Sequence, residues 1–136
     1  MIKIALVSLA ALTLSGSTKE RPQVEVAPFR MTIASTPTGW SGHCDSGCAW
    51  IDATVECNDA CSVRIDAYSL AAVSALPTVP RDSSAFVFVA ERVDGSVHAV
   101  ARRGTAWSEL TWSCDGSVHR AVVHSFGVSA MCRDGS

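Results

Sequence analysis

The sequence has no concentration of positive charge. Its 11 lysines and arginines are scattered singly or in one pair, Arg102 and Arg103, and 13 aspartates and glutamates outnumber them. Proteins that hold nucleic acid need a basic surface to replace the counterions of the phosphate backbone. We therefore expect no nucleic-acid partner.

Long apolar runs are also scarce, since only the N-terminus has one. Lys3 precedes an apolar run over residues 4–14, and small residues follow at 15–17. This order is typical of a secretory signal peptide, and the run is too short for a permanent membrane span. The alternative is an N-terminal helix packed into the core. We predict cleavage before Thr18, a secreted or periplasmic protein and no stable membrane anchor.

Recognisable catalytic and metal-binding motifs are absent as well. The chain has no HExxH and no GxSxG, and its cysteines form two C-x₃-C spacings where zinc ribbons most often use C-x₂-C. We therefore predict no catalytic residue, no metal and no cofactor. The four histidines are the residues on which an enzymatic reading would depend: His43, His98, His119 and His124.

The exported chain does contain six cysteines. An even number in an oxidising compartment predicts disulfides. Two pairs flank three-residue loops, so we expect each pair to bridge adjacent strands and the last two cysteines to pair with each other. The predicted disulfides are Cys44–Cys48, Cys57–Cys61 and Cys114–Cys132. A bridge between the first two pairs is the main alternative, because sequence alone does not select the connectivity.

Two stretches of the chain match each other. Residues 49–57 and 106–114 both begin with Ala-Trp, carry an acid two residues after the tryptophan, share a threonine and end in cysteine, at an offset of 57. Further matches occur upstream at an offset of 56 and downstream at an offset of 58. The differences fall where turns are expected, and turns tolerate insertions. We predict an internal repeat; a chance likeness is the alternative.

The local pattern predicts strands. β-branched and aromatic residues fill short runs, and turn residues such as Asp94 and Gly95 separate them. The expected strands are 30–35, 40–44, 48–57 and 61–70 in the first unit and 85–92, 97–102, 105–114 and 119–128 in the second. We predict an all-β fold of two four-stranded antiparallel meanders, disulfide-bonded and packed as a sandwich or a closed barrel.

The predicted organisation is that of one domain. Its parts are a signal peptide over 1–17, an extended N-terminal segment over 18–29 and a β domain over 30–136. Within the domain we place repeat unit 1 at about 30–76, a connector at 77–84 and repeat unit 2 at about 85–132.

Four aromatic residues are candidates for ligand binding. Trp50 and Trp107 occupy matching positions on the strand face that also carries acids, and Tyr68 matches Phe126. We expect this face to point outward, so that the tryptophans are partly exposed or buried under a strand end. Exposed aromatic rings can stack on a sugar or anchor a protein. The alternative is that the repeated tryptophan is an architectural plug.

The connector is a second candidate site. Its prolines favour an extended conformation, and a stiff exposed loop reduces the entropy lost when a protease inhibitor binds. The candidate inhibitory residues are Pro77, Val79, Pro80 and Arg81. An ordinary linker between the units has the same composition.

The sequence therefore supports three functional hypotheses. The first is a non-catalytic extracytoplasmic domain that binds an unknown protein or carbohydrate. The second is a secreted inhibitor of a protease or other hydrolase acting through residues 77–84. The third is a small secreted enzyme, in which a histidine would meet a carboxylate or serine inside a pocket.

Overall fold

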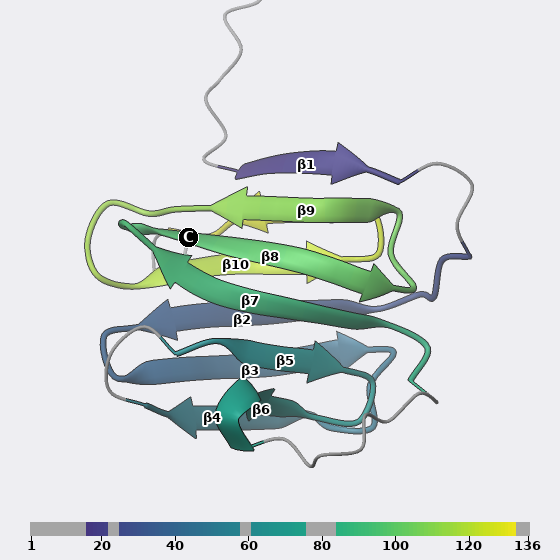
Figure 1. Ribbon diagram of the computed structural model, residues 1–136, viewed down its shortest axis with the longest axis horizontal. Helices are drawn as coiled ribbons and strands as arrows, with labels where there is room; N and C mark the ends of the chain where they lie inside the picture. The colour runs from purple at the N-terminus through teal and green to yellow at the C-terminus, as the bar shows by residue number, and fades with distance from the viewer. Residues whose placement is uncertain (1–15, 22–24, 58–60, 76–83, 133–136) are drawn as a thin grey trace, which may run out of the picture.

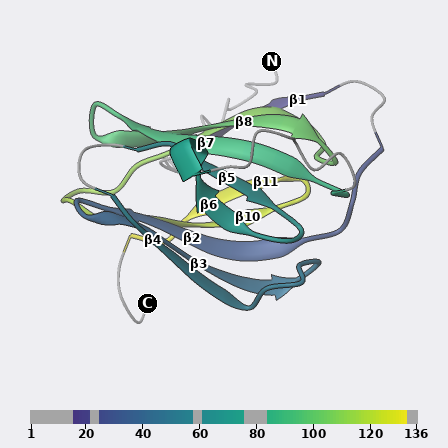
Figure 2. The same ribbon diagram turned by 60° about the horizontal axis from the view of Figure 1, so that its bottom comes forward.

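The computed structural model describes residues 16–21, 25–57, 61–75 and 84–132, and these form two antiparallel sheets stacked face to face (Figures 1 and 2). The six-stranded sheet has the order β1 (Gly16–Glu20), β9 (Trp107–Trp112), β8 (Ser96–Arg103), β7 (Val87–Val93), β5 (Val63–Asp66) and β6 (Leu70–Ala72). The five-stranded sheet has the order β11 (Gly127–Ala130), β10 (His119–His124), β2 (Arg30–Thr36), β3 (Gly39–Ser46) and β4 (Asp52–Glu56). A 3₁₀ turn, Val73–Ala75, follows β6. The predicted all-β class is confirmed.

The two predicted meanders do not form one sheet each. The strands β2, β3 and β4 lie in the five-stranded sheet, whereas β5 and β6 cross to the other sheet. In the second half β7, β8 and β9 stay together and β10 and β11 cross over. The predicted strand over 61–70 is broken by a turn at Ala67 and Tyr68, and the one over 119–128 by a turn at Ser125 and Phe126. The described strands thus form two separate sheets, each with strands from both halves.

Strand order and register are the same in both sheets once β1 is set aside. Each sheet contains the first three strands of one half, followed by the last two strands of the other. Val63 pairs with Ala90 in the six-stranded sheet, and Ala121 pairs with Ile33 in the five-stranded sheet. Ala121 corresponds to Val63 at an offset of 58, and Ala90 corresponds to Ile33 at an offset of 57.

The bulges correspond as well. The β2–β3 ladder shifts register between Arg30 and Met31, and the β7–β8 ladder shifts between Val87 and Phe88, at an offset of 57. The predicted offset of 56 for this part of the chain is therefore wrong, because the register requires 57.

Trp40 and Trp112 fill equivalent places in the core, but they come from non-equivalent strands of the two halves. Trp40 on β3 pairs with Val55 on β4, while Val97 on β8 pairs with Trp112 on β9. Each ladder thus contributes one tryptophan and one valine at this level. The indole Nε1 groups donate to corresponding carbonyls of the two halves, those of Cys61 (2.9 Å) and His119 (3.2 Å).

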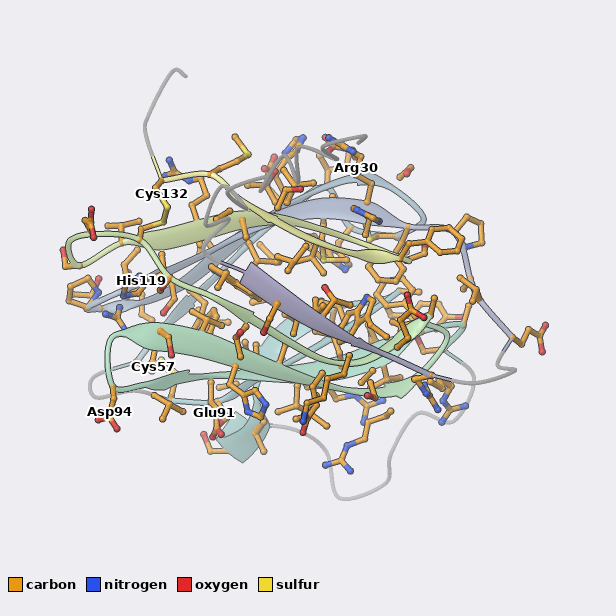
Figure 3. The ribbon with its side chains drawn as sticks, turned by 90° about the horizontal axis from the view of Figure 1, so that it is seen from above. Arg30, Cys57, Glu91, Asp94, His119 and Cys132 are labelled. Atoms are coloured by element: carbon orange, nitrogen blue, oxygen red, sulfur yellow. A yellow bond between two sulfur atoms is a disulfide. The ribbon has the colours of Figure 1, made fainter. Side chains whose placement is uncertain are left out.

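The core lies between the sheets, where side chains from both inner faces meet (Figure 3). Alternation along the strands places every second residue inward, as in Val63 and Ile65 or Leu110 and Trp112. The fully buried residues that dominate the core are Met31, Ile33, Phe86, Phe88, Trp107, Leu110, Trp112 and Val123. The strand β7 is central in its sheet, because β8 and β5 pair with its two edges.

Three disulfides close the structure, and their pairing is the one predicted. The Cα–Cα separations are 6.2 Å for Cys44–Cys48, 6.1 Å for Cys57–Cys61 and 5.2 Å for Cys114–Cys132. Complete pairing of the cysteines suits an oxidising, extracytoplasmic environment. Within the described ranges, no helix has the length and apolarity of a membrane span.

The N-terminal strand adds to the edge of the six-stranded sheet. β1 pairs with β9 from Gly16 opposite Trp112 to Glu20 opposite Trp107. Cleavage before Thr18 would therefore leave only the second part of β1, from Thr18 to Glu20, in the exported chain. Residues 1–15, which make up most of the predicted signal peptide, lie outside the described part.

Candidate functional site

The two turns that break the predicted strands, at 66–69 and 124–127, lie at one end of the sandwich, which we call the aromatic end. The backbone N–H of Ala106, just before β9, donates to Ser125 O at 2.8 Å, and the N–H of Ala49 donates to Ala67 O at 2.6 Å. In Figure 1 the arrows of β5, β8 and β10 all point to this end, on the right. The structure therefore brings Tyr68 and Phe126 to the same end of the molecule.

Tyr68 and Phe126 are the exposed aromatic residues of these turns. The exposed fraction is 45% for Tyr68 and 70% for Phe126. The N–H of Tyr68 donates to Asp66 Oδ1 at 2.8 Å, and the N–H of Phe126 donates to His124 Nδ1 at 3.1 Å. In both turns, the side chain two residues earlier accepts the aromatic residue's N–H. The two rings thus project from turns that are closed in the same way.

The acceptor role of His124 requires an unprotonated Nδ1. Burial, followed by the positive charge of Arg30, lowers the pKa of His124 below its ordinary value. A lowered pKa keeps the imidazole neutral, so that Nδ1 remains able to accept the N–H of Phe126.

Buried serines tie the turns to the core. Ser125 Oγ accepts the N–H of Phe29 at 2.8 Å and donates to Ala27 O at 2.6 Å. In the other turn, Ser84 Oγ accepts the N–H of Ala67 at 3.0 Å. Ser84 and Ser125 are 2% and 3% exposed, so these bonds are shielded from water. The turns are therefore held from inside as well as within themselves.

The two predicted tryptophans lie beneath the turns. Trp107 is fully buried, and its Nε1 donates to His124 O at 2.9 Å. Trp50 is half-buried, and its Nε1 donates to Asp66 O at 3.0 Å. Each indole thus supports the residue at which its turn begins. This is the plug role that the sequence left open as an alternative.

Trp107 is buried at the start of β9 rather than partly exposed, because β9 contains a bulge. Glu20 pairs with Trp107 and Lys19 with Glu109, so Ser108 is an extra residue in β9. An extra residue reverses the alternation of side chains on one side of the bulge. Trp107 therefore points into the core although Glu109 points outward.

Ile51 extends the apolar surface of the aromatic end. Its exposed fraction is 67%, and it directly precedes β4, which starts at this end. Alternation predicts an inward side chain here, but β4 begins only at Asp52, so Ile51 lies outside the pleated strand. Val73 (42%), Val93 (42%) and Val118 (39%), exposed apolar residues away from this end, are less exposed and smaller.

A histidine–carboxylate pair lies on the outer face of the five-stranded sheet. His43 Nδ1 is 2.7 Å from Asp52 Oδ1, and its Nε2 is 3.4 Å from Asp45 Oδ1. The hydrogen bond to Asp52 raises the pKa of His43, which favours the imidazolium. The pair borders a depression of about 220 Å³ whose floor includes Thr32 and Ser41. A histidine thus meets a carboxylate, but its second nitrogen faces Asp45.

The other histidines are dispersed. His98 lies between Glu91 at 4.0 Å and Glu109 at 3.8 Å on the outer face of the six-stranded sheet. His119 is buried at the opposite end from the aromatic turns, and its Nδ1 accepts the N–H of Cys114 at 2.9 Å. Among the described residues, no three histidines, cysteines or acids are arranged to hold a metal ion.

The candidate inhibitory residues Pro77, Val79, Pro80 and Arg81 lie outside the described part of the chain. Of the predicted connector, the structure describes Ser84 alone. Its buried hydroxyl also donates to Phe86 O at 2.7 Å. The connector therefore ends at a fixed point close to the turn of Tyr68.

Sequence reasoning missed the residues that organise the turns, Asp66 and His124. Aspartate followed by two turn residues is a known local signal, because its side chain accepts the N–H two residues later. The same role for His124 has no comparable signal. Searches against protein-family models, curated proteins and solved structures found no match to this chain.

Proposed function

We propose that this protein is a non-catalytic extracytoplasmic binding domain that takes its partner at the aromatic end. One observation supports this most: Tyr68 and Phe126 are exposed aromatic side chains on two turns that are closed and anchored in the same way. The partner is a protein or a carbohydrate surface.

The physical argument is pre-ordering. An exposed aromatic ring offers a large contact area and loses little side-chain entropy on binding, because it has only two rotatable side-chain bonds. Rings on rigid turns lose still less, since the backbone is already fixed before the partner arrives. Phe126 also lies 6.5 Å from the His124 ring, centre to centre, which limits its freedom further. These features are typical of residues that dominate binding energy.

We also propose that the two halves of the domain descend from one duplicated unit. The common strand order, the corresponding bulges and the exchanged Trp40 and Trp112 support this proposal. Duplication explains why the two aromatic turns are alike and occur at the same end.

The proposal is tested with a panel of defined ligands. A glycan array and a displayed random-peptide library would be probed with the exported protein, its disulfides intact. We expect selected ligands to lose at least tenfold in affinity for Phe126→Ala and for Tyr68→Ala. They should retain affinity for Val93→Ala and Val118→Ala, the matched apolar truncations at the opposite end. Ligands that bind all four variants equally, or an absence of ligands from both libraries, would contradict the proposal.

The inhibitor hypothesis is the first alternative. It is favoured by the buried anchoring of Ser84, which fixes one end of a proline-rich segment. If it holds, the protein should inhibit at least one hydrolase from a panel of secreted proteases, and deletion of residues 77–80 should abolish that inhibition. Inhibition that survives the deletion would refute this mechanism.

The enzyme hypothesis is favoured by the pair His43–Asp52 beside its depression. Asp52 holds Nδ1, so Nε2 would act as a base only on a substrate that displaces Asp45, whose Oδ1 lies 3.4 Å from it. If this is the site, hydrolysis of a nitrophenyl acetate, phosphate or glucoside should be lost in His43→Ala and retained in His98→Ala. Equal rates in both variants, or no turnover by the wild type, would exclude it.

A further inference from the structure

A cavity at the aromatic end is lined by charged residues. It encloses about 400 Å³ and lies between the segment that follows β1 and the end of β8. Its walls are Arg21, Glu25, Val26, Ala27, Ser84, Ala85, Arg103 and Gly104. This volume is within the range of about 300–1,000 Å³ that is usual for small-ligand sites.

Backbone hydrogen bonds fix two walls of this cavity. The N–H of Arg21 donates to Ala106 O, and the N–H of Ala27 donates to Gly104 O, both at 2.8 Å. Val26 forms a parallel bridge with Gly104. The cavity is therefore bounded by backbone that pairs with the end of β8 and the start of β9.

Arg21, which lines this cavity, has an unsatisfied donor. Its Nη1 is buried, and it has no hydrogen-bond partner among the described residues. A buried donor without an acceptor is destabilising, and more so when the group is charged. The guanidinium would recover this cost by turning to meet an anionic oxygen of a ligand in the cavity. Guanidinium groups match planar oxyanions particularly well, since two parallel N–H donors can meet two oxygens.

The balance of charge indicates which oxyanion fits. Arg21 and Arg103 contribute two positive charges to the walls, and Glu25 contributes one negative charge. A carboxylate would neutralise this net charge of one, whereas a doubly charged phosphate would leave the filled cavity with an excess negative charge beside Glu25. Val26, Ala27 and Ala85 supply apolar wall for the rest of the ligand.

We propose that this cavity binds a carboxylate, with Arg21 as its principal partner. The carboxylate belongs to a small organic acid or to the C-terminus of a peptide, and both present the same group to the guanidinium. The site does not depend on Tyr68 or Phe126, so it stands apart from the binding surface proposed above.

The test is calorimetric titration of the oxidised, exported protein. Butanoate and butanamide have the same shape and differ in charge, so we expect saturable binding of butanoate alone. An N-acetylated alanine tripeptide with a free C-terminus, compared with its amide, distinguishes a peptide end from a small acid. Inorganic phosphate should bind at least tenfold more weakly than the best carboxylate.

Matched variants test whether Arg21 is the residue that binds the carboxylate. Arg21→Gln should weaken carboxylate binding at least tenfold, whereas Arg102→Gln, which removes an exposed charge from the same strand end, should leave it within twofold. Glu25→Gln should strengthen binding several-fold because it removes the opposing charge. If Arg21→Gln fails to fold, the change in carboxylate affinity of Glu25→Gln still tests whether the carboxylate binds in this cavity. Absence of binding by every carboxylate, equal binding of acid and amide, or equal affinities in Arg21→Gln and Arg102→Gln would overturn the proposal.

Discussion

Gly104 lies directly against the backbone of Phe86: a Cβ placed on Gly104 would be 2.6 Å from the Cα of Phe86. Gly47, the corresponding glycine of the first half, has the same relation to Phe29, whose Cα would be 2.8 Å away. Both glycines have a positive φ, +81° and +88°, which side chains disfavour. Gly104 and Gly47 thus allow the chain to pass close to the start of the neighbouring strand.

We predict that Gly104→Ala lowers the free energy of unfolding by about 3 kcal/mol or more, because backbone strain and overpacking add. Gly95 is the matched control, since its φ is +79° but nothing lies within 4 Å of its Cβ position. Gly95→Ala should cost only about 1 kcal/mol. Urea denaturation of both variants measures the difference. Equal losses would show that the close approach at Phe86 is unimportant.

The disulfides are predicted to contribute unequally. Cys114–Cys132 spans 18 positions, whereas Cys57–Cys61 spans four. On the chain-entropy model the long bridge contributes about 3 kcal/mol and the short one about 2 kcal/mol. Replacing each pair by serine and measuring urea unfolding should therefore reveal the larger loss for the long bridge. The opposite order would indicate that native-state contacts outweigh loop closure.

Stability should fall as the solution becomes acidic. His119 lies between the sheets, on the side of Asp94 in Figure 3, and burial followed by the charge of Arg92 lowers its pKa below 6.5. The unfolded chain then binds the proton more tightly, so this contribution is complete above pH 6.5 and is lost as pH falls below it. Protonation of Nδ1 also removes its bond with the N–H of Cys114.

Melting temperatures at about pH 7.5 and about pH 5.5 test this expectation. We expect His119→Gln to reduce the pH dependence relative to the wild type. Part of the slope should persist, because the pKa of His124 is lowered as well. An unchanged slope in His119→Gln would assign the acid sensitivity to other groups.

Truncation of Trp107 and of Phe126 should affect stability differently, because Trp107 supports the fold and Phe126 is proposed to bind the partner. Trp107→Ala removes a buried ring and the donor to His124 O, so it should cost about 3–5 kcal/mol of stability. Phe126→Ala removes a ring that is 70% exposed and should change stability by only about 0.5 kcal/mol. Denaturation of the two variants provides the comparison. A large loss in Phe126→Ala would mean that its exposed ring is structural.

Local chemistry was sufficient for part of the fold. The hairpin at Asp94 and Gly95 forms as predicted, since both residues have a positive φ there, 43° and 79°. The pairs Cys44–Cys48 and Cys57–Cys61 follow from short loops that keep their ends close. In each case the interacting groups are close in the sequence, so the sequence contains the whole interaction.

The candidate site was predictable only in part. The correspondence of Tyr68 and Phe126 and their expected outward position come from the sequence, but the burial of Trp107 does not follow from the strand alternation. One extra residue at Ser108 decides which way Trp107 points, and that bulge depends on pairing with β1. The cavity around Arg21 likewise combines segments that are far apart in the sequence.

The sequence by itself determined the class of fold, most of the strands and the local hairpins, and it favoured the disulfide pairing that the structure has, because these depend on alternation, turn chemistry and loop length. Only the tertiary structure decided that β5, β6, β10 and β11 change sheets, and that the two aromatic turns lie at the same end. The physical reason is that a strand's alternation specifies which face is buried, but its edges can pair with any suitable neighbour.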